Sequence, residues 1–85
     1  MSLNAGLEAI LMVVDEPVGT ADLAAALDVP EAEVVDALHY LRREYANPDA
    51  PRGFELREVD GKWRLYSSPL YADVVGRFIV EGQLA

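Results

Sequence analysis

Residues 19–45 constrain the fold of this chain most, because they predict two short helices joined by a tight turn. Thr20 is a suitable N-cap for the first of these helices, and Asp22 lies in its first turn, where the helix dipole favours an acidic side chain. Asp28 stands where such a turn needs left-handed backbone, which Asp tolerates better than most residues do. The second helix is expected to begin at Pro30, since proline suits the first helical position. The segment therefore predicts a helix-turn-helix unit.

A β-hairpin is expected after this unit. The runs Phe54–Val59 and Lys62–Ser67 are strand-like, and the Asp60-Gly61 pair between them suits a type I′ turn, which needs positive φ at both positions. This turn sets a register in which Glu58 lies opposite Trp63. Four apolar side chains then share the face that covers the helices, namely Phe54, Leu56, Trp63 and Leu65.

Two further helices are expected on either side of this region, one over residues 3–15 and one that starts at Ser68 and Pro69. The core stripes predicted by helical spacing are Leu3, Leu7, Ile10, Leu11 and Val14 in the first helix, Val34, Ala37, Leu38, Leu41 and Tyr45 in the third, and Leu70, Val74, Phe78 and Ile79 in the last. The expected fold class is α+β. It is a winged helix-turn-helix with three helices, a two-stranded β-hairpin wing and a C-terminal helix, in one domain spanning residues 1–85.

The first helix carries a second apolar face in addition to its core stripe. A helix that meets water on one side is usually polar there, but Ala5, Ala9, Met12 and Val13 give this one an apolar outer side. Either the helix lies centrally in the core of a small domain, or this face packs on another chain. In the second case the expected partner contacts are Ala9, Met12 and Val13, with Tyr66 and Tyr71 as aromatic anchors.

The net negative charge of the chain comes entirely from its first fifty residues. They carry ten acidic and two basic side chains, whereas the remaining thirty-five residues carry five of each, so the net charge of −8 belongs to the helical half. The helix that would enter a DNA groove begins with Glu31 and Glu33 and also carries Asp36, which phosphate repels. A small basic group could still follow a phosphate backbone from the wing, namely Arg57, Lys62 and Arg64. Direct DNA contact is therefore expected to be absent or weak.

Few residues in this chain are suited to catalysis. The chain has no cysteine, and its one histidine, His39, lies off the buried stripe and is expected at the surface or the core boundary. Its glycines are isolated, so none of them forms a phosphate-binding loop. We therefore expect no catalytic, cofactor or metal site and no small-molecule substrate. The sequence also lacks a bilayer-spanning apolar run and a signal peptide, which predicts a cytoplasmic protein without membrane contact.

Several short motifs, taken together and in order, carry a resemblance to a known family. They are Leu7-Glu8-Ala9-Ile10-Leu11, Glu16-Pro17-Val18, Arg52-Gly53-Phe54-Glu55-Leu56, and Trp63-Arg64-Leu65 followed by Tyr71. In this order and spacing the chain resembles, over nearly its whole length, the N-terminal winged-helix domain of the segregation and condensation protein B (ScpB) family. None of these motifs is a catalytic signature.

The resemblance implies a set of partners. Proteins of this family are non-enzymatic bacterial subunits that act with the kleisin ScpA and, through it, the SMC ATPase in chromosome condensation and segregation. They have two winged-helix domains and form homodimers, to which the N-terminal domain contributes. The resemblance thus implies that residues 1–85 are the N-terminal half of a longer protein that is associated with the nucleoid. The alternative from the fold alone is a winged-helix DNA-binding transcriptional regulator.

Overall fold

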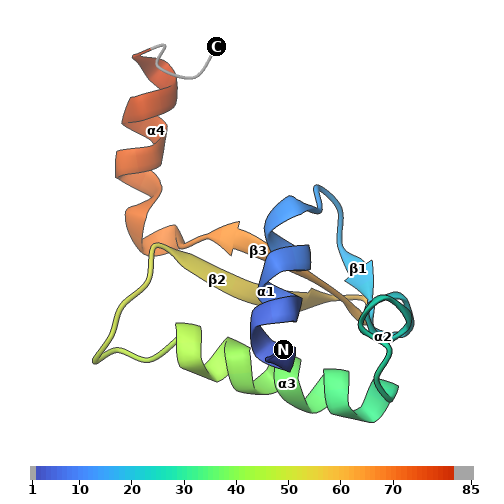
Figure 1. The fold of residues 1–85 in the computed structure, drawn as a ribbon. Helices are drawn as coiled ribbons and strands as arrows, with labels where there is room; N and C mark the ends of the chain where they lie inside the picture. The colour runs from blue at the N-terminus through green and yellow to red at the C-terminus, as the bar shows by residue number, and fades with distance from the viewer. Residues whose placement is uncertain (1, 82–85) are drawn as a thin grey trace.

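The computed structural model describes residues 2–81, which form a helical layer packed on one face of a small antiparallel sheet (Figure 1). The elements in chain order are α1 (Leu3–Val13), β1 (Val18–Gly19), α2 (Thr20–Leu27), α3 (Glu31–Tyr45), β2 (Phe54–Val59), β3 (Lys62–Ser67), the 3₁₀ turn η1 (Pro69–Tyr71) and α4 (Ala72–Val80). The predicted α+β class and the helix-turn-helix followed by a hairpin are confirmed.

The hairpin has the predicted register, with Glu58 opposite Trp63. Asp60 and Gly61 adopt φ values of 52° and 77°, as the type I′ turn requires. The predicted two-stranded wing is confirmed, and the structure adds a strand that the sequence did not predict, because β1 pairs with β3 and extends the sheet to three strands in the order β1-β3-β2. Two residues are too few to show an alternating pattern, so only the long-range pairing reveals this strand.

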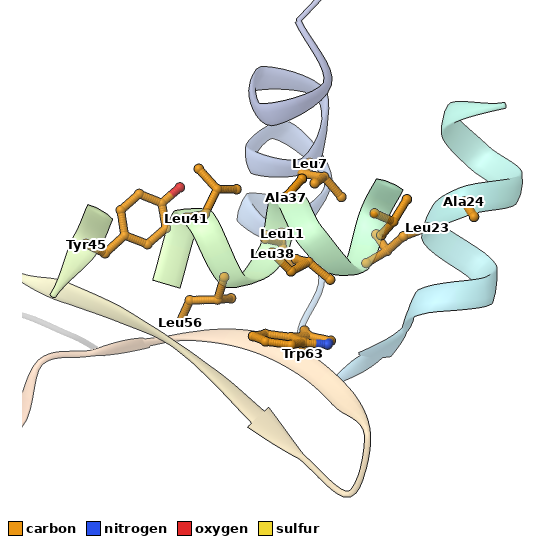
Figure 2. Close-up of a cluster of buried hydrophobic side chains, with 11 residues drawn as sticks. Leu7, Leu11, Leu23, Ala24, Ala37, Leu38, Leu41, Tyr45, Leu56 and Trp63 are labelled. Atoms are coloured by element: carbon orange, nitrogen blue, oxygen red, sulfur yellow. The ribbon is translucent and has the colours of Figure 1, made fainter. Parts of the chain in front are cut away.

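The core lies between the three helices and the inner face of the sheet (Figure 2). Its buried members include Leu7 and Leu11 from α1, Leu23 and Ala24 from α2, all five predicted residues of α3, and Leu56 and Trp63 from the hairpin. Phe54 and Leu65 are partly buried against this cluster. The predicted inner face of the hairpin is therefore confirmed, and each helix of the helix-turn-helix unit is fixed by apolar contacts on one side.

The predicted helix ends differ from the observed ones by one or two residues. α1 ends at Val13 because Val14 already has extended backbone, with ψ of 142°. Thr20 is not the N-cap of α2, since Gly19 takes that position and the Thr20 hydroxyl instead donates to Glu31 Oε1 at 2.6 Å. Asp28 has the predicted left-handed conformation, with φ of 55° and ψ of 49°.

The C-terminal helix does not pack as predicted. Its apolar side was expected to turn toward the core, but α4 projects away from the domain and Leu70 in the preceding turn is 83% exposed (Figure 1). Ser68 does act as a cap, but of η1, where its Oγ accepts from the Leu70 backbone N–H at 3.3 Å. The Ser68 N–H also donates to the Gly53 carbonyl at 2.8 Å, which holds the chain at the end of the hairpin farthest from α2. Helical periodicity thus identified which residues form the apolar side of α4, but the prediction that this side packs on the core was wrong.

Candidate protein-interaction surface

The largest exposed apolar surface in the described part of the chain lies on α4. Val74, Val75, Phe78 and Ile79 share one side of this helix, whereas Asp73 and Arg77 lie on the other side. We call this side, together with Leu70 and Tyr71 at its foot, the α4 face. The large Phe78 side chain of this face is also open to solvent, since Phe78 is 46% exposed. An apolar surface of this kind on a small domain is a candidate interaction site.

A second exposed apolar surface lies on the outer side of α1. Met12 is 72% and Val13 80% exposed, and Ala5 and Ala9 are exposed on the preceding turns. These four residues are the α1 face. The core needs only the opposite side of the helix, which Leu7 and Leu11 provide. The alternative that buries α1 on all sides is therefore wrong, and partner contact through this face stays a prediction.

The structure separates the two tyrosines that were predicted as aromatic anchors. Tyr71 lies in η1 and is exposed at the foot of α4, so it belongs to the α4 face. Tyr66 lies on the outer face of the hairpin, half-buried by two arginine side chains. Ala9, Met12 and Val13 thus lie together on α1, Tyr71 lies beside a surface that sequence reasoning assigned to the core, and Tyr66 lies apart from both.

The predicted basic wing consists of two stacked arginines and one separate lysine. Arg57 and Arg64 are directly opposite each other, and their guanidinium carbons lie 4.8 Å and 5.3 Å from the centroid of the Tyr66 ring. Arg57 is also paired with Glu55, whose carboxylate accepts from its Nε at 2.8 Å. Stacking on Tyr66 and pairing with Glu55 offset the repulsion of two like charges across the strands.

Lys62, the third basic residue of the wing, lies near the hairpin turn. It lines an open depression of about 410 Å³ together with Glu16, Pro17, Val59 and Asp60. Two acidic residues therefore line the same depression as this lysine, so the surface around Lys62 is not uniformly basic. The described residues of the hairpin provide no continuous basic stripe for a phosphate backbone.

The exposed end of α3 is acidic, as its sequence predicted. Glu31, Glu33 and Asp36 are all exposed, and the first two lie in the first turn, where the helix dipole stabilises carboxylates. His39 lies at the core boundary, half-buried, with its ring edge-on to Trp63 at a centroid distance of 5.1 Å. This histidine supports the packing of α3 on β3.

A buried tyrosine that the sequence did not single out for any function fixes α1 against α3. The Tyr45 hydroxyl donates a hydrogen bond to Glu8 Oε2, and its ring meets Phe54 edge-on at 4.8 Å. Burial raises the pKa of Tyr45 above its ordinary value, and the hydrogen bond to Glu8 adds to this effect. Because Glu8 precedes Ala9, this contact holds the α1 face in place relative to the core.

Within residues 2–81, no group of three or more His, Cys, Asp or Glu side chains is arranged to hold a metal ion. In the same range, no helix is both long enough and apolar enough to cross a bilayer. The exposed features of the described chain are thus two apolar helix faces, an acidic helix end and a wing of mixed charge.

Comparison with solved structures finds the same fold. The crystal structure of ScpB from Mycobacterium tuberculosis matches with a TM-score of 0.87 at 32% identity, covering 98% of this chain and 51% of that one. A dimer of the ScpB N-terminal domain complexed with an ScpA peptide matches with a TM-score of 0.80 at 26% identity, covering 88% and 91%. A conserved hypothetical protein from Chlorobium tepidum matches with a TM-score of 0.72 at 28% identity, covering 91% and 47%.

Sequence comparison agrees with these structural matches. The segregation and condensation protein B of Desulforamulus reducens is 30% identical over 74 residues, which are 87% of this chain, and the chain spans about two fifths of that relative's length (40%). The family model for segregation and condensation complex subunit ScpB matches residues 5–85. With this match and the shared fold, the chain belongs to the family of the segregation and condensation complex subunit ScpB.

Proposed function

We propose that this domain is a non-enzymatic structural part of a bacterial chromosome segregation and condensation complex, in which it self-associates and binds the kleisin ScpA. Family membership supports the complex, and the similar N-terminal domain that is a dimer with an ScpA peptide supports both contacts. The observation that carries the proposal is the pair of exposed apolar faces on α1 and α4. Through ScpA the domain would be linked to the SMC ATPase, at the nucleoid in the cytoplasm.

The proposal treats residues 1–85 as the N-terminal winged-helix domain of a longer two-domain protein. The chain covers 91% of the solved ScpB N-terminal domain but 51% of the longer ScpB chain, which supports this assignment. The contacts that a second domain makes would then add to those argued from this structure.

The charges favour a polypeptide partner over DNA. The end of α3 that would meet base edges presents exposed carboxylates at Glu31, Glu33 and Asp36. A nucleic-acid interface normally neutralises phosphates with Lys and Arg, and here Arg57 is already paired with Glu55. The role of a DNA-binding regulator is therefore the less favoured one.

Light scattering after size exclusion tests the self-association. We expect the wild type to be a dimer at high micromolar concentration and Met12→Glu to be largely monomeric, because a charge would be buried without a partner. Glu33→Gln, on the exposed acidic end of α3, is the matched control and should leave the mass unchanged. A wild type that stays monomeric throughout this range would contradict self-association.

Fluorescence anisotropy tests the choice of partner. Labelled overlapping peptides that cover the ScpA of the same organism should include at least one that binds, with an affinity that depends weakly on salt. A labelled duplex DNA should bind weakly or not at all at low salt. Tight duplex binding that weakens steeply with added salt would favour the DNA-binding role instead.

A further inference from the structure

The two exposed apolar faces differ in shape. The α4 face is bulky, with Val74, Phe78 and Ile79 projecting from one side of a helix. The α1 face is shallow along its length, because Ala5 and Ala9 occupy successive turns of one stripe. A ridge of large side chains on one helix packs well into a shallow surface on another.

In the observed position of α4, the rest of its own domain does not cover the α4 face. α4 projects from the end of the hairpin, and its main contacts are with the preceding turn η1 (Figure 1). The Cα radius of gyration is 14.4 Å, whereas a compact 85-residue domain is expected to have about 12 Å. The helix therefore extends as an arm, and the described residues of its own domain leave its apolar face open.

From this arrangement we infer that α4 of each copy packs on the α1 face of a second copy, so that a two-fold dimer contains the contact twice. The inference rests on the proposed self-association and specifies the surfaces that form it. In a two-fold dimer any contact between different faces is repeated by symmetry, so one contact covers both faces of both molecules.

The exposed area is sufficient for such a dimer. The exposed apolar side chains of the α1 and α4 faces together present on the order of 1,000 Å² per copy, and a stable interface buries roughly 800 Å² on each partner. Packing α4 against α4 alone would leave Met12 and Val13 in water. Packing α1 against α1 alone would leave the larger α4 face in water.

Charge also favours the contact between unlike faces. The segment 3–17 carries Glu8, Asp15 and Glu16 and no basic residue, so two copies of α1 placed face to face would bring like charges together. α4 carries one acidic and one basic side chain, Asp73 and Arg77, and is therefore neutral. Packing of α4 on α1 of the second copy thus avoids the repulsion between two acidic helices.

Cysteine cross-linking tests this pairing directly, because the chain has no cysteine of its own. Met12→Cys and Phe78→Cys are made as separate full-length variants, mixed in equal amounts, allowed to exchange and treated with a short bismaleimide. We expect the mixed product, identified by intact mass, to exceed either homodimeric product more than tenfold. A mixture of Met12→Cys with Glu33→Cys is the control and should give little mixed product.

Charge rescue gives a second measurement without covalent chemistry. Phe78→Glu should weaken self-association more than tenfold, and mixing it with Met12→Lys should restore most of the dimer, because one Glu then faces one Lys and the second contact stays wild type. Both changes are at exposed positions, and circular dichroism checks that each variant is folded.

The outcomes separate this inference from the proposed function. A wild type that is dimeric but whose Phe78→Cys variant cross-links mainly to itself, with no rescue by Met12→Lys, would overturn the pairing of α4 with α1 and leave self-association intact. A wild type that is monomeric in light scattering would overturn both.

Discussion

At the scale of single residues, Tyr45 gives the sharpest test of how the helices are held. Its hydroxyl joins α3 to Glu8 of α1, and burial together with this hydrogen bond raises its pKa above the ordinary value of 10.0. Tyr45→Phe should lower the free energy of unfolding by about 1 kcal/mol at neutral pH, because one hydrogen bond to a carboxylate is lost. Thermal and urea unfolding of both proteins measure the difference.

The raised pKa of Tyr45 also predicts the direction in which stability changes with pH. The unfolded chain loses the Tyr45 proton near pH 10, whereas the folded chain keeps it, so wild-type stability should fall as the pH rises above 10. Tyr45→Phe lacks this loss, and its disadvantage should shrink at alkaline pH. Tyr40→Phe removes an exposed hydroxyl and is the control. If the difference in the free energy of unfolding between wild type and Tyr45→Phe grew above pH 10, the raised pKa of Tyr45 would be contradicted.

At the scale of elements, the β2–β3 hairpin depends on the backbone of its turn. Gly61 has φ of 77°, and a Cβ added there would meet no atom within 4 Å, so Gly61→Ala tests backbone strain alone. We expect it to lower the free energy of unfolding by about 1–2 kcal/mol. Gly53→Ala is a matched control, since it too has open space and lacks the positive φ, and it should be close to neutral. Equal losses in the two variants would contradict a role for the left-handed turn.

The elements also show which parts of the fold could be predicted from the sequence. The hairpin register was predictable because the Asp60-Gly61 turn leaves one way to place Leu56 and Trp63 on the same face. β1 was not predictable, because its two residues are a strand only through their pairing with β3, which lies far along the chain. For α4, the spacing of apolar residues showed which side of the helix is apolar, but it contains no information on what packs against that side. The α1 face was found from sequence because its helix has more apolar surface than one core can use.

At the scale of the whole molecule, the net charge of −8 opposes the association that the apolar faces favour. Two such copies repel each other at low ionic strength, and salt screens this repulsion over a Debye length of about 10 Å at 0.1 M. Raising the salt from about 0.02 M to about 0.2 M should therefore strengthen self-association, by roughly a few-fold in dimer affinity. A DNA complex of the same domain would respond with the opposite sign.

Sedimentation equilibrium at several salt concentrations measures this response. The double variant Glu33→Gln with Asp36→Asn removes two charges from exposed positions of α3 that belong to neither apolar face, so it tests charge without changing those faces. We expect its dimer to be tighter than the wild type at low salt and to change less as salt is added, because less repulsion remains to be screened. A dimer that weakens with added salt would indicate that ion pairs dominate its interface. That result would contradict an association driven by apolar packing against net charge repulsion.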